Sequence, residues 1–255
     1  MIPLSISTGP AALLLAAWIK WSLPFDASAH GPAIDRHLLL NLWIILILAA
    51  LAHLILLAGL VLRRRAEAVS WRVEYLPLAA LAVLFAFLGI RAQRLWAAAR
   101  YTGADPAALQ VQVVGEQFAW YFRYPGADYT FGATNPALVD AGAGNPLGID
   151  SADPHGADDI VASELVLPAN REIDLRINSL DVIHGFSVPQ MRLKQNAVPG
   201  MTIHVHFRPK VPGTYAILCT QVCGLGHYRM NANLRVLPPE QFTAWLAARQ
   251  KAVQR

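Results

Sequence analysis

The sequence predicts two membrane-spanning helices followed by an all-β domain. Apolar residues make up 55% of the 255 residues and charged residues only 15%, a balance typical of membrane proteins rather than of soluble globular domains. Two long apolar runs lie among residues 1–100, and from residue 109 onward apolar and polar residues alternate as in β-strands. The chain therefore divides into an N-terminal segment (1–37), a transmembrane hairpin (38–100) and a β-domain (101–255).

The two membrane spans are predicted at Leu38–Leu62 and Glu74–Trp96, each long enough to cross about 30 Å of hydrocarbon. Three consecutive arginines at 63–65 follow the first span, and short loops rich in Lys and Arg stay on the cytoplasmic side. Both ends of the hairpin then lie outside, which places the β-domain in the periplasm or on a topologically equivalent outer side. The expected location is the inner (cell) membrane of a bacterium. His53, within the first span, is expected to hydrogen-bond a neighbouring subunit.

The N-terminal segment, residues 1–37, contains an apolar run followed by an Ala-Ser-Ala sequence at 27–29 that resembles a signal-peptidase site. No basic residue precedes the apolar run, however, and Lys20 interrupts it. We therefore expect an interfacial or short membrane-embedded helix, with Trp18 and Trp21 near the lipid headgroups.

Positive charge is concentrated in the membrane-associated part of the chain. Residues 1–100 hold nine Lys and Arg against four Asp and Glu, whereas residues 101–255 hold twelve against thirteen. The net charge of +4 therefore reflects the membrane flanks. A lipid membrane is the expected partner of this charge, and no nucleic-acid partner is expected.

Alternating apolar residues predict strands at 109–114, 172–177, 203–208 and 231–237, separated by segments rich in Pro and Gly. Many short strands of this kind predict a β-sandwich. Residues 239–250 have apolar side chains at helical spacing and predict a closing helix. His204 and His206 share one face of a predicted strand and are expected to be solvated rather than to bind metal.

Candidate metal ligands gather in one short stretch. Both cysteines of the chain, Cys219 and Cys223, lie within twelve residues that also contain His227 and Met230, and His184 lies 35 residues before the first cysteine. The resulting pattern is H-x34-C-x3-C-x3-H-x2-M. Thiolate, imidazole and thioether groups are the soft and borderline donors that copper prefers.

Three other interpretations of these residues remain open. The two cysteines can form a disulfide, which leaves the histidine and methionine without a role. A zinc site with two Cys and two His ligands is the stronger rival, and a pair of buried structural thiols is also ordinary. Thioether sulfur is a poor ligand for zinc and a good one for reduced copper, so Met230 favours copper.

The ligand pattern resembles the binuclear CuA motif of cytochrome c oxidase subunit II. Residues 180–189 (LDVIHGFSVP), 194–201 (KQNAVPGM) and 115–125 (GEQFAWYFRYP) resemble three further stretches of that family. Together with the two spans, the resemblance covers most of the chain. It narrows the predicted fold to a transmembrane α-helical hairpin followed by an all-β cupredoxin-like Greek-key sandwich.

The resemblance also implies a set of copper ligands. The two thiolates bridge two copper ions, each of which also binds one imidazole, and a thioether and a main-chain carbonyl complete the set. The implied ligands are His184, Cys219, Gln221, Cys223, His227 and Met230.

By the same resemblance, the chain accepts electrons from cytochrome c or a c-type cytochrome domain and passes them to haem in subunit I of a haem-copper oxidase. That complex, which includes further subunits, reduces oxygen to water and translocates protons. The CuA subunit of a haem-copper nitric oxide reductase is the alternative, because the final chemistry lies in the partner subunit. A membrane-tethered copper chaperone or a structural zinc module would belong to a different class and would give no delocalised mixed-valence signal.

Three positions depart from the family pattern. Gln221 and Asn196 stand where the family usually has Glu and Asp, which weakens the case for the family's magnesium site at the subunit I interface. Phe118 stands where the family has the tryptophan through which electrons are proposed to enter. The candidate entry residues are then Trp120, Tyr121 and Phe118 itself, or another donor delivers the electrons. Plain core packing is the alternative for all three aromatic residues.

Two further features have a functional and a structural interpretation. Glu74 opens the second span, where the family often places a glutamate that guards a proton path, although Pro77 follows too closely for the usual pattern. A carboxylate that stabilises a helix N-terminus is the alternative. Residues 124–170 contain seven acidic residues and no Lys or Arg, which fits either a landing surface for a basic cytochrome or a solvated loop insertion.

Overall fold

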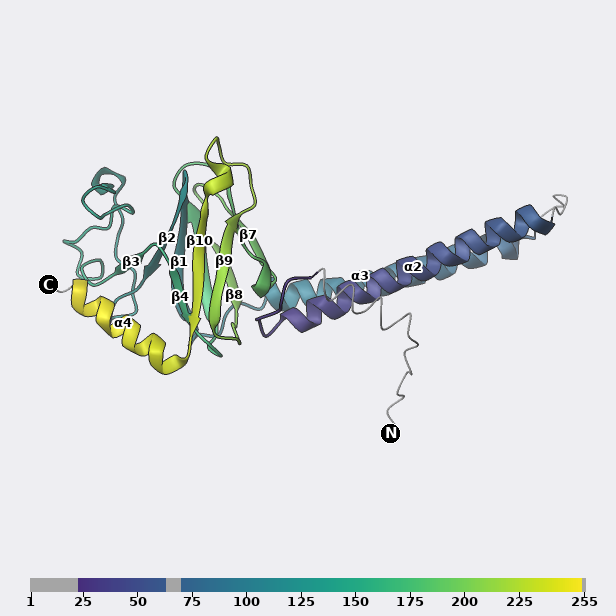
Figure 1. The fold of residues 1–255 in the computed structure, drawn as a ribbon, viewed down its shortest axis with the longest axis horizontal. Helices are drawn as coiled ribbons and strands as arrows, with labels where there is room; N and C mark the ends of the chain where they lie inside the picture. Colours follow the sequence, from purple (N-terminus) through teal and green to yellow (C-terminus); the bar gives the residue numbers. More distant parts are fainter. Residues whose placement is uncertain (1–22, 63–69, 254–255) are drawn as a thin grey trace.

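The computed structural model describes residues 23–62 and 70–253. It consists of a long helical hairpin attached to a β-sandwich, with a helix packed along the side of the sandwich away from the hairpin (Figure 1). The helix expected around Trp18 and Trp21 lies outside the described residues.

The two hairpin helices are α2 (Gly31–Leu62) and α3 (Trp71–Arg100), and each is long and apolar enough to cross a membrane. Both extend beyond the predicted spans. Helix α2 begins seven residues before Leu38, because Pro32 lies in its first turn, where the missing amide hydrogen costs nothing. Ser70 caps α3 by accepting a hydrogen bond from the amide of Arg72.

Two five-stranded sheets form the sandwich, with strand orders β3-β2-β1-β5-β8 and β4-β10-β9-β6-β7. The chain passes repeatedly from one sheet to the other, as the Greek-key prediction requires. The four strand segments predicted from alternation correspond to β1, β5, β8 and β10, which confirms them. The strands are β1 (Leu109–Glu116), β2 (Ala119–Tyr124), β3 (Ile160–Ala162), β4 (Leu165–Pro168), β5 (Ile173–Ser179), β6 (His184–Val188), β7 (Leu193–Ala197), β8 (Ile203–Phe207), β9 (Gly213–Cys219) and β10 (Asn231–Leu237).

Most neighbouring strands are antiparallel, but two pairs are parallel: β1 with β5, and β4 with β10. Short 3₁₀ helices connect several strands: η1 (Pro136–Leu138), η2 (Pro189–Met191) and η3 (His227–Arg229). The predicted closing helix is confirmed as α4 (Pro239–Val253). Its Trp245 ring packs against Tyr124 of β2, with ring centroids 5.2 Å apart.

The core lies between the two sheets. In β1, Leu109, Val111 and Val113 are buried while Gln110 and Gln112 between them are half-buried, as the alternation predicts. In β6, by contrast, all five residues are buried. This strand therefore lies deep in the fold, and its first residue is a candidate metal ligand.

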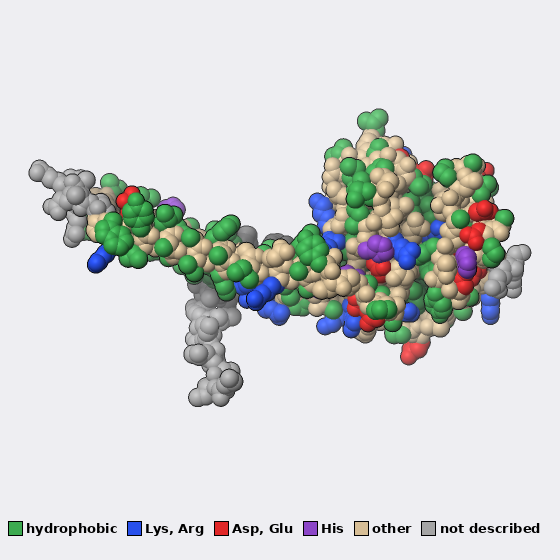
Figure 2. All heavy atoms as spheres, turned by 180° about the vertical axis from the view of Figure 1, so that it is seen from behind, with side chains coloured by type: hydrophobic (Ala, Val, Ile, Leu, Met, Phe, Trp, Pro, Cys, Tyr) green, Lys and Arg blue, Asp and Glu red, His purple; other side chains and the backbone are tan. Residues whose placement is uncertain are grey.

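The acidic insertion, residues 125–159, forms a lobe beside α4 (Figures 1 and 2). A buried ion pair between Arg123 of β2 and Asp159 anchors it, and Arg123 also donates to the carbonyl of Gly132 at 2.6 Å. Several other carboxylates of the lobe accept hydrogen bonds from its own backbone; for example, Asp153 accepts from the amide of Ala133 at 2.7 Å. These contacts favour a structural role for the acidic residues, and the cytochrome landing surface stays a prediction.

Candidate metal centre

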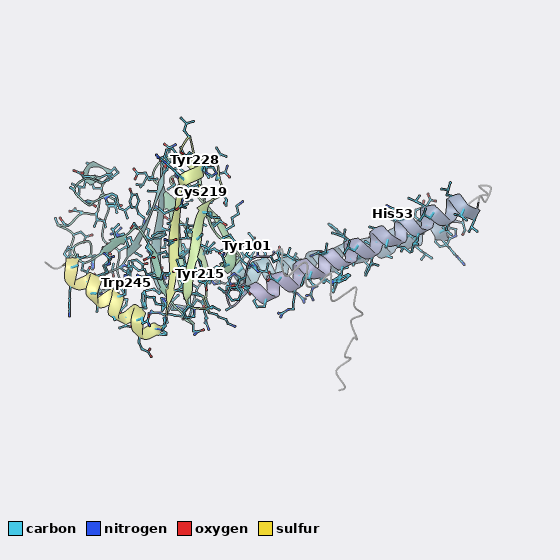
Figure 3. All side chains as sticks on the ribbon, in the orientation of Figure 1. His53, Tyr101, Tyr215, Cys219, Tyr228 and Trp245 are labelled. Atoms are coloured by element: carbon cyan, nitrogen blue, oxygen red, sulfur yellow. The ribbon has the colours of Figure 1, made fainter. Side chains whose placement is uncertain are left out.

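The candidate ligands meet at one end of the sandwich, near the labels of Cys219 and Tyr228 in Figure 3. His184 is the first residue of β6, and Cys219 is the last residue of the neighbouring strand β9. Phe186 of β6 pairs with Cys219 of β9. This antiparallel pairing brings Cys219 close to His184, which lies 35 positions before it in the sequence.

The two thiol groups lie in the middle of the ligand group. Their sulfur atoms are 3.9 Å apart and both thiols are free, so the disulfide alternative does not describe this structure. The sulfur of Cys219 lies 3.2 Å from the main-chain oxygen of Gln221. The sulfur of Cys223 lies 3.7 Å from Nδ1 of His227.

The other imidazole and the thioether lie on the opposite side of Cys223. Nδ1 of His184 is 3.1 Å from Sδ of Met230, and that sulfur is 3.7 Å from Sγ of Cys223. Both His184 and Met230 are buried. All six predicted ligand groups therefore form one continuous set of contacts.

His184 is held by an aspartate that the sequence analysis did not single out. Its Nε2 donates to Oδ1 of Asp181 at 2.8 Å, which turns Nδ1 towards the sulfur donors. The other carboxylate oxygen of Asp181 accepts from the amide of Gln117 at 2.8 Å. The sequence signal for this contact is an aspartate three residues before a ligand histidine. This signal is not specific, because Asp and His also occur at other spacings throughout the chain.

Close packing also fixes the histidine ring. The Trp120 ring lies edge-on to His184, with centroids 5.8 Å apart and an interplanar angle of 67°. Gly115 lies on β1, opposite Trp120 of β2. A Cβ atom at Gly115 would come within 2.9 Å of Cδ2 of the His184 imidazole. Glycine is therefore required at position 115 for the present orientation of His184.

The electrostatics of the site favour a bound cation. Burial and, to a smaller extent, the neighbouring Cys219 thiol raise the pKa of the Cys223 thiol to about 11. Two adjacent thiolates, one of them buried, therefore need a compensating positive charge. Although partial burial of Asp181 acts to raise its pKa, hydrogen bonds from His184 and from backbone amides lower it, so this carboxylate stays ionised beside the site.

The chemistry of the donor set fits copper. Ligand atoms of His184, Cys219 and Cys223 lie within 4.8 Å of one another. A zinc site would use the thiolates and imidazoles, but it would leave the buried thioether of Met230 without a role. The structural-thiol alternative explains neither the imidazoles nor the thioether.

The three aromatic residues through which electrons were expected to enter have different surroundings. Trp120 is only 2% exposed and packs between His184 and Phe186. Phe118 is half-buried, and its ring lies so close to Gly226 that a Cβ there would come within 2.4 Å of it. Tyr121 is half-buried, and burial followed by the nearby Glu116 raises its pKa. Their role in electron transfer stays a prediction.

Glu74 and His53 are not brought near the ligands. Glu74 is exposed in the first turn of α3. Because it lies 26 residues before Arg100, it is about 40 Å along the helix from the end nearest the β-domain. Its proton role stays a prediction. Nδ1 of His53 lies 2.7 Å from the carbonyl oxygen of Ala49 in its own helix, so that nitrogen has an intrahelical partner.

The two strand histidines differ from the expectation that both are solvated. His204 is exposed, and its Nδ1 lies 2.9 Å from Oδ2 of Asp174. His206 is mostly buried, with 16% of its side chain exposed, because α2 and α3 cover its end of the sheet. The expectation was therefore wrong for His206.

The fold and the site together define a class of protein: two apolar helices that precede a β-sandwich with a group of thiol, imidazole and thioether side chains able to hold a metal. The family model described as "Cytochrome C oxidase subunit II, periplasmic domain" matches residues 109–236. Because this match covers half of the chain, the chain belongs to the cytochrome c oxidase subunit II family. The predicted fold class, a helical hairpin followed by a cupredoxin-like sandwich, is confirmed.

Curated relatives carry the same family name. "Alternative cytochrome c oxidase subunit 2" of Bradyrhizobium diazoefficiens is 38% identical over 141 residues, which cover 54% of this chain and 50% of the relative. "Cytochrome c oxidase subunit 2" of Thermostichus vulcanus is 34% identical over 137 residues, covering 54% of this chain and 32% of the relative. The chain thus spans half the length or less of these relatives. The periplasmic domain of cytochrome oxidase subunit II of Bradyrhizobium japonicum matches with 25% identity and a TM-score of 0.43, over 59% of this chain and 97% of that one.

Proposed function

We propose that this chain is the electron-accepting subunit of a haem-copper terminal oxidase and that it holds a binuclear copper centre. The observation that carries the proposal is the continuous set of donor contacts at the end of the sandwich, with distances from 3.1 to 3.9 Å. The proposed ligands are His184, Cys219, Gln221 through its carbonyl, Cys223, His227 and Met230.

The positions of the two thiols favour two metal ions over one. Cys223 contacts the thioether of Met230 on one side and the imidazole of His227 on the other. Cys219 contacts both Cys223 and the carbonyl of Gln221. The Cys223 thiol thus contacts one imidazole, the thioether and the other thiol, an arrangement that supports a bridging role. A copper pair bound there would accept and release single electrons.

The protein holds these donors in fixed positions and excludes water from three of the six. His184, Cys223 and Met230 are each at most 5% exposed. The carbonyl of Cys223 accepts a hydrogen bond from the side chain of Gln117 at 2.5 Å, which ties the ligand loop to the β1–β2 connection. A site that changes little in geometry between redox states allows fast electron transfer, and burial and hydrogen bonds to its ligands tune the potential.

The donor protein is proposed to dock at the end of the sandwich that holds the ligands. Val222, Leu225 and Tyr228, which belong to the ligand loop, have exposed fractions of 79%, 98% and 86%. Such a group of exposed apolar side chains is typical of an interaction surface. A cytochrome c or a c-type cytochrome domain that docks here would be close to the ligands, with Phe118 and Trp120 packed beneath.

The rest of the oxidase is proposed from the family. Subunit I would take the electrons into its haem and reduce oxygen to water, and other subunits would pack against the hairpin. The arginines at 63–65 favour a cytoplasmic connection between the helices, and therefore a periplasmic β-domain. The relatives described above carry oxidase names, and no observation on this chain favours a nitric oxide reductase. With Gln221 and Asn196 in place of carboxylates, a magnesium site is not proposed.

Electron paramagnetic resonance of the copper-loaded, full-length chain tests the copper proposal. We expect a delocalised mixed-valence signal and two copper ions per chain by metal analysis. Cys219→Ser and Cys223→Ser should each abolish the signal, whereas Val222→Ser, an exposed position between the two ligands, should retain it. An ordinary mononuclear signal, zinc in place of copper, or survival of the signal in either cysteine variant would contradict the proposal.

The acceptor is tested separately in the purified complex. Identification of the co-purifying haem subunit, together with oxidation of reduced cytochrome c under oxygen and under nitric oxide, distinguishes an oxidase from a nitric oxide reductase. We expect turnover with oxygen. Turnover with nitric oxide alone would refute the oxidase assignment while leaving the copper centre intact.

A further inference from the structure

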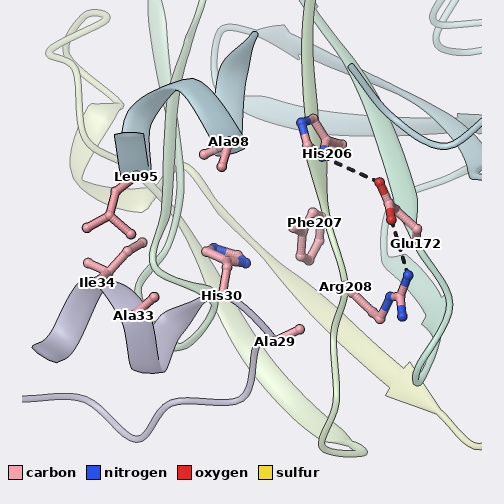
Figure 4. A pocket seen from close by; sticks show the side chains of 11 residues that line it. Ala29, His30, Ala33, Ile34, Leu95, Ala98, Glu172, His206, Phe207 and Arg208 are labelled. Atoms are coloured by element: carbon pink, nitrogen blue, oxygen red, sulfur yellow. Dashed lines mark hydrogen bonds and ion pairs between the residues drawn. The ribbon is translucent and has the colours of Figure 1, made fainter. Parts of the chain in front are cut away.

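Two adjoining cavities lie where the hairpin meets the β-domain. One has a volume of about 360 Å³ and the other about 280 Å³, and both are lined by His30, Ile34, Leu95, Ala99 and His206. The start of α2, the end of α3 and strand β8 surround the first of them (Figure 4). We call the two cavities together the junction pocket.

Three side chains that line the smaller cavity have a buried nitrogen without a hydrogen-bond partner. These atoms are Nδ1 of His37, Nη1 of Arg100 and Nε2 of His206. Native proteins pair nearly all of their buried polar groups, so several unpaired nitrogens in one cavity indicate that something else meets them.

The other atoms of two of these groups are already engaged, which fixes their orientation. Nη2 of Arg100 donates to the carbonyl of Lys194 at 3.0 Å, and the guanidinium lies over the Trp96 ring at 5.2 Å. Nδ1 of His206 lies 3.5 Å from Oε1 of Glu172, as the dashed line in Figure 4 shows. Nη1 of Arg100 is therefore held in place as a donor for a ligand, and Nε2 of His206 is held facing the same cavity.

The charged residues that line the smaller cavity favour an anionic ligand. Among its lining residues none is acidic, and five are basic or imidazole side chains: His30, His37, Arg100, Arg192 and His206. Arg192 forms a bidentate pair with Asp35, at 2.7 and 2.8 Å, so its charge is compensated. Arg100 has no carboxylate partner within the described part of the chain and supplies the uncompensated positive charge.

The position of the pocket favours an amphiphilic ligand, with a polar head and an apolar tail. Its remaining lining is largely apolar and includes Leu38, Leu95 and Trp96. The pocket lies at the ends of α2 and α3 nearest the β-domain, where helices that cross a membrane reach the lipid headgroups. Tryptophan is enriched at that level. A ligand with a charged head at Arg100 and an apolar tail directed along the helices fits both parts of the lining.

We propose that the smaller cavity of the junction pocket binds an anionic phospholipid. Its phosphate would accept a hydrogen bond from Nη1 of Arg100, beside the imidazoles of His37 and His206, and an acyl chain would lie against Leu38 and Leu95. Charge-assisted contacts between arginine and phosphate are among the stronger polar interactions in proteins, and clustered basic groups at a membrane surface select anionic lipids.

Native mass spectrometry of the full-length chain, delipidated in detergent, tests this proposal. Phosphatidylglycerol and phosphatidylcholine with identical acyl chains are added in turn. We expect retention of phosphatidylglycerol to exceed that of phosphatidylcholine by about fivefold, the preference expected from one basic side chain at a membrane surface. Arg100→Gln should abolish the preference. Arg94→Gln, which removes the same charge from α3 outside the pocket lining, should retain it.

Two further arms keep the test decisive. Because Arg100→Gln also loses the bond to Lys194, Ala99→Trp offers a second variant that fills the pocket but keeps the charge, and we expect it to lose the lipid while its circular dichroism spectrum is unchanged. Equal retention of the two lipids, or a preference that survives both variants, would overturn the proposal. Displacement of the lipid by millimolar inorganic phosphate would indicate a site for a soluble anion and would also overturn it.

Discussion

Asp181 and His184 form a hydrogen bond of 2.8 Å that sets the orientation of the buried imidazole. The bond occupies Nε2, and Nδ1 then lies 3.1 Å from the sulfur of Met230. The carboxylate itself is held by the amide of Gln117 and by Ser179. A connected series of contacts therefore runs from the β1–β2 connection through Asp181 to the ligand group.

Asp181→Asn is predicted to weaken copper binding without unfolding the domain. The variant removes the charge that favours the Nε2–H tautomer of His184, and loss of such a supporting group typically lowers metal affinity by about 10- to 100-fold. Competition with a copper chelator measures the affinity. Asp174→Asn is the matched control, because Asp174 pairs with the exposed His204 in the other sheet. Equal affinities of the two variants would contradict the proposed role.

Gly115→Ala is predicted to disturb the centre through packing alone. The added methyl would lie 2.9 Å from Cδ2 of His184, which is closer than carbon atoms approach in folded proteins. The histidine ring must move, at a cost of about 1–3 kcal/mol in the free energy of unfolding. We expect an altered paramagnetic resonance signal and a lower midpoint in chemical denaturation. Gly142→Ala, in the acidic lobe, should change neither by a measurable amount.

Much of the fold was predictable because its signals are local. Alternation of apolar and polar residues marks strands that are covered on one face, and the predicted range 231–237 coincides with β10. Strand β6 gives no such signal, since all five of its residues are buried. The parallel pairing of β1 with β5 joins segments more than 60 residues apart, and no local pattern specifies it.

The ligand group was predictable because its donor types are rare and their spacing is short. The residues that hold the ligands in position were not predictable. The roles of Asp181 and Gly115 depend on how β1 and the turn before β6 approach each other, and a sequence shows neither distance. The same limit applies to the acidic insertion, where Asp159 is buried against Arg123 rather than exposed to a partner. It also applies to His206, which is covered by a hairpin distant in sequence.

Arg123→Met is predicted to destabilise the β-domain by about 3–5 kcal/mol at neutral pH, because it leaves the buried carboxylate of Asp159 without its ion-pair partner. Chemical denaturation measures the change. Burial raises the pKa of Asp159 even with the arginine present. In the folded variant, the Asp159 carboxyl should therefore keep a proton that it releases above pH ~4 in the unfolded chain. The free energy of unfolding of the variant then falls as the pH rises, and its difference from the unsubstituted protein becomes smaller in acid. Arg171→Met, an exposed control, should cost less than about 0.5 kcal/mol. A deficit that is independent of pH would argue against an ionised Asp159.

Asp35→Asn is predicted to loosen the β-domain from the hairpin. Asp35 of α2 accepts two hydrogen bonds from Arg192, at 2.7 and 2.8 Å, and the same guanidinium also donates to the carbonyls of Pro24 and Pro189. Loss of the carboxylate removes a charge-assisted bidentate contact, typically about 1.5–3 kcal/mol for hydrogen bonds to charged groups. We expect faster amide hydrogen exchange at Ala27, whose amide bonds to the carbonyl of Gln190 beside this contact. Exchange in the central strand β1 should be unchanged, because the hairpin packs against the edge strand β8 of that sheet. Asp105→Asn is the control, because Asp105 is an exposed aspartate between α3 and β1, and it should alter exchange neither at Ala27 nor in β1. Unchanged protection of Ala27 in Asp35→Asn would show that the Asp35–Arg192 pair does not hold the hairpin and the β-domain together.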